Sequence, residues 1–318
     1  MVFPLAMLAA LLADALLGWP QGLYARIGHP VTWLGRLVSA LDDRLNTGRP
    51  ARRRMMGVLT LSVTVLIAAL PAWLLQVLII KLADWTWVGV GLAGLAAWPL
   101  VATRSLYDHV AAVARPLCQG DLSAGRQAVA NIVGRDVSVL DEAGVARAAM
   151  ESLAENTSDG VVAPLFWGAV LGLPGIAAYK AINTLDSMVG HRTERHEAFG
   201  WASARLDDVV NLIPARLTGL LLALASPRPV HALAIMIRDG HRHRSPNAGY
   251  PEAAMAGALG VRLAGPRIYH GEVADEPWLN GAAPDPAPVD LSRALRLYVI
   301  AMGLGAALLA TIGLMSAA

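Results

Sequence analysis

Ionisable side chains stand beside some of the most apolar parts of this chain. The stretch ESLAENTSDGVVAPLFWGAVLG, residues 151–172, places Glu151 and Glu155 four positions apart, with Asp159 just beyond them, directly before an apolar run. Carboxylates four residues apart share one face of a helix, and their repulsion favours a cation between them. Magnesium is the natural candidate because it prefers a few carboxylate oxygens completed by phosphate and water. The alternative is that these acids pair with arginines or face water.

A second polar cluster follows in YKAINTLDSMVG, residues 179–190. The i, i+3, i+4 and i+7 spacing of one helical face is occupied by Lys180, Asn183, Thr184 and Ser187. Only two of the 26 basic residues are lysines, so Lys180 is a candidate for chemistry that needs a compact, titratable ammonium; chance usage is the alternative. In FGWASARLDDVVNLIPARL, Asp207 and Asn211 are again four apart, with Asp208 adjacent.

A third cluster, RDGHRHRSPNAGYPEAAMAGALG at residues 238–260, is rich in arginine. Pro251 is predicted to be the first residue, N1, of a helix that runs to about Leu259. A helix N-terminus behind a glycine-containing loop and several arginines is suited to a phosphate. The alternative is a basic patch that touches anionic lipid at the membrane surface.

Membrane helices must position these clusters. The chain has 318 residues, 55% hydrophobic and only 16% charged, which is too apolar for an ordinary soluble protein of this length. A membrane crossing takes about 20 helical residues, and the predicted spans are residues 2–18, 57–80, 85–102 and 294–315. Seven arginines and no lysine lie between the first two spans. The positive-inside rule therefore places this loop in the cytoplasm and both termini outside.

Two further apolar runs, residues 161–179 and 209–225, leave the topology open. Helix-breaking or charged residues interrupt both runs: Gly172, Pro174 and Gly175 in the first, and Pro214 and Arg216 in the second. These breaks favour buried or re-entrant helices over spans. The predicted fold is an all-α integral membrane protein of one domain, with about four spanning helices and a cytoplasmic-facing helical region over residues 104–293.

Local signals predict some element boundaries. Ser138 and Asp141 make a capping-box-like start, and good helix formers continue from Val139 to about Asn156. The Pro- and Asp-rich segment 273–290 predicts a linker to the last span.

Residue usage argues against several other classes of protein. The single cysteine, Cys118, excludes an intrachain disulfide framework and a cysteine-based metal cluster. The net charge is only +2 and no basic patch is interleaved with aromatic residues, which argues against a nucleic-acid partner. GVGLAG at residues 89–94 matches a dinucleotide fingerprint, but it lies inside a predicted span without a preceding strand. It is interpreted as small-residue packing between helices.

Taken in order, the motifs resemble those of the CobD/CbiB family. They are HPVTWLGRL (residues 29–37), ESLAENTSDGVVAPLFW, YKAINTLDSMVGHR, FGWASARLDDVVNLIPARL and RDGHRHRSPNAGYPEAAMAGALGVRLAGPRIYHGE. The resemblance covers nearly the whole chain and is most specific over residues 151–272. It implies an integral membrane adenosylcobinamide-phosphate synthase. Such an enzyme joins the amine of (R)-1-amino-2-propanol or its phosphate to the remaining propionate carboxylate of adenosylcobyric acid, using ATP and Mg²⁺.

The resemblance and the polar clusters together suggest a role for each candidate residue. The predicted catalytic residues are Lys180, Glu151, Asn183 and Asp186. The predicted metal ligands are Glu155, Asp159, Asp207 and Asp208. The predicted substrate or phosphate-binding residues are Asn156, Asn211, Arg238, Arg242, Arg244, Ser245 and Asn247. The expected location is the inner membrane, among lipid and membrane-bound enzymes of cobalamin assembly, with the site facing the cytoplasm.

Two other classes of function remain open at this point. A secondary transporter or sensor with re-entrant helices would use intramembrane polar residues to bind a solute or ion. A non-catalytic scaffold for corrinoid assembly would tolerate neutralisation of Glu155 and Asp208. Nearly all the polar clusters fall between the third and last predicted spans, and no convincing inverted repeat is found, which favours the synthase over a transporter.

Overall fold

The chain folds into two compact units that are almost entirely helical. The computed structural model describes residues 2–84, 86–134, 136–191, 193–269, 272–274 and 276–317. Trp85, His270 and Gly271, which belong to a predicted span and to a motif above, lie outside these described residues. Unit 1 comprises Met1–Ala102, Ala163–Asn211 and Leu308–Ala318, and unit 2 comprises Thr103–Val162 and Leu212–Ala307. Each unit therefore joins segments that are far apart in the sequence.

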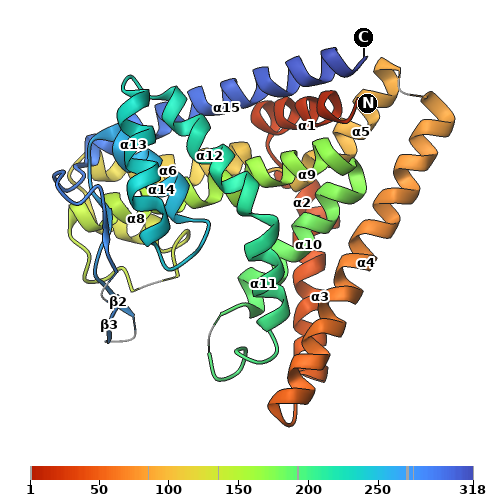
Figure 1. Cartoon of the computed structure of the whole chain (residues 1–318), viewed down its shortest axis with the longest axis horizontal. Coiled ribbons are helices and arrows are strands. Elements are labelled where there is room, and N and C mark those ends of the chain that lie inside the picture. Colours follow the sequence, from red (N-terminus) through yellow and green to blue (C-terminus); the bar gives the residue numbers. More distant parts are fainter. Residues whose placement is uncertain are drawn as a thin grey trace. The chain divides into compact units, whose positions relative to one another are not determined.

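Unit 1 is organised around α10 (Figure 1). Its elements are α1 (Phe3–Leu17), α2 (Gln21–Ile27), α3 (Pro30–Leu45), α4 (Pro50–Ala83), α5 (Trp87–Ala97), the 3-10 helix η1 (Trp98–Leu100), α9 (Ala163–Leu171), α10 (Leu173–Val189) and α11 (Trp201–Val210). α10 packs against α3, α4, α9 and α11. Behind it lies a core of Val38, Leu185, Val189 and Phe199, all almost fully buried. Burial of each such side chain contributes about 1.5–3 kcal/mol, which fixes the face that α10 presents on its other side.

The break between α9 and α10 is built around Gly172. This residue has a φ of +72°, a left-handed conformation that glycine adopts without steric cost. The N–H of Leu173, which opens α10, donates a 2.8 Å hydrogen bond to Oε1 of Gln76 on α4. The buried side chain of Gln76 thus supplies a hydrogen-bond acceptor for a first-turn N–H group, which has no acceptor within its own helix. The predicted interruption of the run 161–179 is confirmed.

Unit 2 surrounds α14 (Gly249–Leu259). Its other helices are α6 (Thr103–Cys118), α7 (Leu122–Val129), α8 (Glu142–Asn156), the π-helix η2 (Thr157–Val162), α12 (Leu212–Ala225), α13 (Pro229–Asp239), the 3-10 helix η3 (Gly240–Arg242) and most of α15 (Pro288–Ala317). Every residue of α14 except Tyr250 is buried, and the helix packs against α8, α12 and α13. A Cβ on Gly257 would lie 2.9 Å from Cα of Ala232, so small residues let α13 approach α14 closely.

Two small antiparallel sheets complete unit 2. β1 (Leu263–Ala264) pairs with β4 (Trp278–Leu279), and β2 (Arg267–Tyr269) pairs with β3 (Glu272–Ala274). The predicted linker over 273–290 is therefore wrong, since part of it is strand. The Trp278 ring lies 4.7 Å from the guanidinium of Arg147 and 4.2 Å from that of Arg262, and both arginines bind Asp285. Contacts with Arg147 and Arg262, which are distant in the sequence, therefore hold this polar segment in place.

Among the residues that the structure describes, two helices are long and apolar enough to cross a membrane, α4 and Pro288–Ser316 of α15. They coincide with the predicted spans 57–80 and 294–315. The number rises to as many as four if each of two bent helix pairs is counted as one span. The predicted spans 2–18 and 85–102 correspond to shorter helices, because α1 has 15 residues and α5 has 11, before the proline-containing η1. α1 packs against α5 and α9 within unit 1.

The polar motifs of unit 2 lie on helices whose limits differ slightly from prediction. α8 starts at Glu142 and not at Val139, because Asp141 caps it by accepting a 2.7 Å hydrogen bond from the Gly144 N–H. The Ser138 hydroxyl instead donates to Asp136. α8 ends at Asn156 as predicted, and the chain continues directly into η2. α14 also ends at Leu259 as predicted, but it begins at Gly249, two residues before the predicted first residue, Pro251.

The Gln76 contact generates a first prediction. Gln76→Leu leaves the buried Leu173 N–H without its acceptor, so we expect a loss of about 1–3 kcal/mol of stability. Gly172→Ala is expected to be destabilising too, because its Cβ would lie 2.0 Å from Gln76 Oε1. Thermal unfolding in detergent measures both effects. Gly91→Ala is the matched control, since its Cβ meets nothing within 4 Å; an equal loss of stability in this control would contradict the prediction.

Candidate functional site

The predicted polar face of α10 is present in unit 1, although two of its hydroxyls serve the helix itself. Thr184 donates a 2.7 Å hydrogen bond to the Lys180 carbonyl, and Ser187 donates a 2.8 Å bond to the Asn183 carbonyl. Such bonds to the preceding turn are common for hydroxyl side chains within helices. The face therefore offers Lys180 and Asn183, both half-buried, as its reactive groups.

A chain of hydrogen bonds joins α10 to α11. The Tyr179 hydroxyl donates to Asn211 Oδ1 at 2.9 Å, and Asn211 Nδ2 donates to Asp207 Oδ2 at 2.9 Å. Asp207 is only 9% exposed and Asn211 only 1%. Asn211, which is predicted to bind substrate, thus contacts a buried carboxylate. Tyr179 was not predicted as a site residue; its only sequence signal was its position beside Lys180.

The carboxylates of α10 and α11 form one acidic group. Asp186 interacts electrostatically with both Asp207 and Asp208, and Asn183 lies close to Asp207. Burial raises the pKa of Asp186 above its ordinary value, the nearby His191 opposes this rise, and the charge of Asp208 adds to it. Carboxylates that share a poorly solvated site hold a proton or attract a cation. The group is thus suited to receive a proton or bind an ammonium.

Lys180 has a basic neighbour from the first part of the chain. Its charge interacts with the imidazole of His29, which caps α3 by accepting a 3.2 Å hydrogen bond from the Val31 N–H. The Trp19 ring packs edge-on against this imidazole, with ring centroids 5.0 Å apart. In unit 1, α10 therefore contributes Lys180 to a basic pair with His29 and Asp186 to an acidic group with Asp207 and Asp208. His29 belongs to the HPVTWLGRL motif but was not predicted as a site residue.

In unit 2, the ENTSDG motif lies across the α8–η2 junction. Glu151 is 5% exposed, and its Oε1 accepts a 2.8 Å hydrogen bond from the Ala264 N–H at the start of β1. Asn156 donates to the Ser152 carbonyl one turn earlier. Glu155 is exposed and Asp159 half-buried. Glu151 thus holds a strand, whereas Glu155 and Asp159 are accessible to a ligand. π-Helical turns such as η2 occur frequently at functional sites.

The arginines of the third cluster surround a buried acid. Arg238 bonds Asp239 through two nitrogens at 2.9 and 2.7 Å, and Arg242 lies 3.5 Å from the same carboxylate. Asp239 also accepts a 2.8 Å hydrogen bond from the Asn280 N–H. Burial alone would raise the pKa of Asp239, but these hydrogen bonds and charges hold it below its ordinary value. Arg244 lies 3.3 Å from Glu276. Each predicted phosphate-binding arginine therefore has a carboxylate partner.

The loop before α14 is also internally bonded. Ser245 Oγ accepts hydrogen bonds from the N–H groups of Asn247 (3.3 Å) and Ala248 (3.2 Å). Arg216 donates to Asn247 Oδ1 at 2.7 Å, and its guanidinium lies 3.9 Å from the Tyr250 ring centroid. Two backbone N–H groups of the loop that was predicted to bind phosphate, those of Asn247 and Ala248, are thus already bonded to Ser245. Arg216, predicted only as an interruption of an apolar run, positions the loop.

The predicted metal ligands form two separate pairs. Glu155 and Asp159 belong to unit 2, whereas Asp207 and Asp208 belong to unit 1. Across the described ranges, no three His, Cys, Asp or Glu side chains are grouped so as to hold a metal ion. Asp207 and Asp208 are adjacent on α11, and Asp208 lies 3.9 Å from Arg205.

The acidic group generates a prediction about pH. Asp186 has an ordinary pKa of 3.8 and a higher one in the folded protein, so its ionisation opposes folding. This cost is absent below pH 3.8, where the group is protonated in both states, and appears as pH rises through the folded pKa. Asp186→Asn should therefore raise Tm at about pH 7.5. The gain should shrink as pH falls towards 4.

The control for this measurement is Glu197→Gln, an exposed acid of the same unit. Tm is measured for both variants and the parent protein across the same pH series. A pH-independent gain in Asp186→Asn, or an equal gain in the control, would contradict the burial argument.

Asp239 generates the opposite expectation. Its folded pKa lies below the ordinary value, so its ionised form stabilises the fold, and this stabilisation is lost as pH falls through the folded pKa. Asp239→Asn should lower Tm at neutral pH, because Arg238 and Arg242 lose their anion, and the difference from the parent should narrow in acid. A Tm unchanged at neutral pH would show that the arginine cluster does not need this anion.

Comparison with known proteins identifies the family. The model described as CobD/Cbib protein matches residues 7–298. A cobalamin biosynthesis protein CobD of Rhodobacter capsulatus is 63% identical over 308 residues, which cover 95% of each chain. A protein of the same name from Sinorhizobium fredii is 49% identical, over 87% of this chain and 86% of its own. Another from Brucella suis is 48% identical, over 93% of this chain and 92% of its own. No solved structure matches the chain. The chain therefore belongs to the CobD/CbiB family.

Proposed function

We propose that this protein forms the amide bond between the propionate carboxylate of adenosylcobyric acid and the amine of (R)-1-amino-2-propanol or its phosphate. The observation that carries this proposal is the family membership, with relatives named as cobalamin biosynthesis proteins over nearly the full length of both chains. The polar residues of α10 and α11 add chemical support, because they combine a lysine with a buried acidic group.

The reaction needs an activated carboxylate. In the proposed sequence, ATP transfers its terminal phosphoryl group to the propionate oxygen, which forms an acyl phosphate and releases ADP. The amine then attacks the acyl carbon, and the carbon–oxygen bond to phosphate breaks. One proton must leave the amine nitrogen, and negative charge develops first on the phosphoryl oxygens and then on the acyl oxygen. Groups placed to meet these charges lower the barrier.

Unit 1 has residues suited to these requirements. The Lys180 ammonium is proposed to stabilise the negative charge of the phosphoryl group or of the acyl oxygen. Asp186 is proposed to accept the amine proton, since its raised pKa brings it nearer to neutral pH than an ordinary carboxylate. Asn183 and the Tyr179–Asn211–Asp207 hydrogen-bond chain position these groups. An ammonium-bearing substrate also complements the acidic group electrostatically.

Unit 2 is proposed to contact the phosphates. Glu155 and Asp159 are accessible carboxylates of the kind that hold Mg²⁺ together with phosphate and water, so they fit an ion that enters with ATP. Mg²⁺ would supply charge neutralisation of the phosphates. At least half of the side-chain surface is exposed in each of three arginines, Arg238, Arg242 and Arg244, although each has a carboxylate partner. Their proposed role is to attract an anionic substrate.

The proposed location is the inner membrane, with the catalytic residues on the cytoplasmic side. The arginines between residues 19 and 56 support this orientation through the positive-inside rule. Cytoplasmic exposure also gives access to ATP.

The test is an assay of purified protein in detergent with adenosylcobyric acid, aminopropanol phosphate, Mg²⁺ and ATP. Corrinoid product is followed by mass, and ADP is measured in the same samples. We expect one ADP for each amide formed. The free amino alcohol is assayed in parallel, so that the preferred acceptor is identified. ADP release without product, or neither from folded protein with both acceptors, would contradict the proposal.

Lys180 provides the sharpest variant. Lys180→Met should lower turnover by roughly 100-fold or more, because it removes a charge that stabilises developing anions. Lys81→Met is the matched control, since Lys81 is the other lysine of the chain and lies exposed near the end of α4. Equal activity of the two variants would remove Lys180 from the mechanism.

A further inference from the structure

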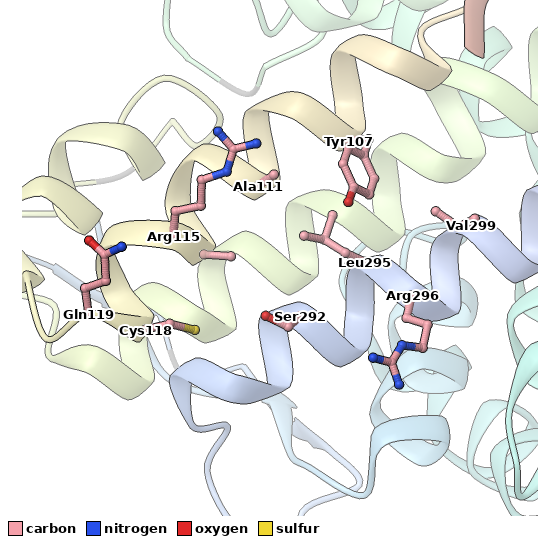
Figure 2. Close-up of a pocket in the computed structure, with 10 residues that line it drawn as sticks. Tyr107, Ala111, Arg115, Cys118, Gln119, Ser292, Leu295, Arg296 and Val299 are labelled. Atoms are coloured by element: carbon pink, nitrogen blue, oxygen red, sulfur yellow. The ribbon is translucent and has the colours of Figure 1, made fainter. Parts of the chain in front are cut away.

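A pocket of about 630 Å³ lies in unit 2 between α6 and α15, outside the residues proposed for catalysis (Figure 2). Apolar residues from both helices line it, among them Ala111, Leu295 and Val299. Its polar lining consists of Tyr107, Arg115, Cys118, Gln119, Ser292 and Arg296. The volume is within the range of sites that bind small molecules, about 300–1,000 Å³.

Two contacts hold the walls of the pocket together. Cys118, at the end of α6, donates a 3.3 Å hydrogen bond to the Pro288 carbonyl at the start of α15. The buried Tyr298 hydroxyl donates a 2.9 Å hydrogen bond to the carbonyl of Thr103, where α6 begins. α6 and the first part of α15 are therefore antiparallel neighbours. The pocket between them is part of the fold of unit 2.

The pocket carries positive charge on both walls. Figure 2 shows Arg115 on α6 and Arg296 on α15. Both are exposed, and neither forms an ion pair with any residue in the described part of the chain. Arg293, one turn before Arg296, behaves differently: it bonds Asp290 and the Leu259 carbonyl. In Figure 2 the two guanidinium groups point to opposite sides of the pocket, so each can attract an anion at its own rim.

Arg296 also marks the point where α15 becomes apolar. It is the last charged side chain in the sequence, and it lies within the membrane-length segment Pro288–Ser316. Val299 and Ile300, three and four residues beyond it, are 53% and 46% exposed. Basic residues at the start of a spanning helix lie at the level of lipid headgroups. The charged lining and this exposed apolar surface are thus continuous.

We propose that this pocket binds an anionic phospholipid. Arg296 contacts the phosphate, Ser292 on the same helix contacts the rest of the headgroup, and an acyl chain follows Val299 along α15. Arg115, on the opposite side of the pocket, adds to the attraction for the anion. Lipid fits better than a soluble anion because the apolar surface begins where the basic lining ends. The inference concerns α6 and α15 alone and does not depend on the proposed reaction.

The experiment uses the full chain, purified in detergent and depleted of lipid. Dioleoyl phosphatidylglycerol or dioleoyl phosphatidylcholine is added, and bound lipid is counted by native mass spectrometry while Tm is recorded. We expect phosphatidylglycerol to be retained and to raise Tm, and phosphatidylcholine to do neither. Arg115→Gln with Arg296→Gln should weaken retention roughly tenfold or more. The control, Arg26→Gln with Arg44→Gln, removes the same charge from exposed positions of unit 1 and should retain the lipid.

Val299→Trp is a second variant that keeps every charge. Since Val299 is exposed, its replacement fills the apolar end of the pocket without disturbing the core, and it too should reduce retention. Inorganic phosphate and ATP are added in separate samples to test for a soluble anion. Equal retention by the arginine variant and its control, or stabilisation by phosphate or ATP equal to that by phosphatidylglycerol, would overturn the proposal.

Discussion

The hydrogen bond from the Leu173 N–H to Gln76 is the interaction on which the polar part of unit 1 depends. It fixes where α10 begins, and a helix turns by about 100° per residue. Lys180, Asn183 and Asp186 lie about two to four turns further along, so a start displaced by one residue would carry all three away from α11 and His29. The apolar core behind α10 then holds the opposite face in place. A single amide within a membrane-length helix thus sets the register of the candidate catalytic residues.

The acids of the chain divide according to burial. Glu151 and Asp239 are buried and accept backbone N–H groups of Ala264 and Asn280, so they secure the strands and turns of unit 2. Glu155 is exposed and accessible to a ligand. Burying a carboxylate is costly unless it is hydrogen-bonded or paired, and the partners of Asp239 satisfy that requirement. The same acidic and basic residues that suggest chemistry in a sequence are therefore also the ones that hold an apolar fold together.

Helix types and several boundaries could be predicted from local sequence, because they follow from local chemistry. Gly172 ends α9, α14 ends at Leu259, and the i, i+3, i+4 spacing places Lys180 and Asn183 on one face. The backbone N–H groups that bind Asp239 and Glu151 could not be predicted, since they belong to Asn280 and Ala264, which are far along the chain and have no periodic signal. For the same reason the strand β4 was mistaken for a linker, although its tryptophan lies against arginines from two other segments. The start of α8 was predicted at Val139, after Ser138, but Asp141 caps the helix and Ser138 bonds Asp136 instead. Both residues are common helix caps, so the local sequence did not distinguish them.

Cys118 gives the α6–α15 pocket a practical property. It is the one thiol in the sequence, it is exposed, and it lies in the pocket lining, held near the Pro288 carbonyl. A maleimide fluorophore or a nitroxide spin label reacts with thiols, so the unaltered polypeptide has a unique attachment point beside the proposed lipid site. Spectroscopy of such a label reports the polarity and occupancy of that pocket in detergent, nanodiscs or native membranes, without removal of competing cysteines.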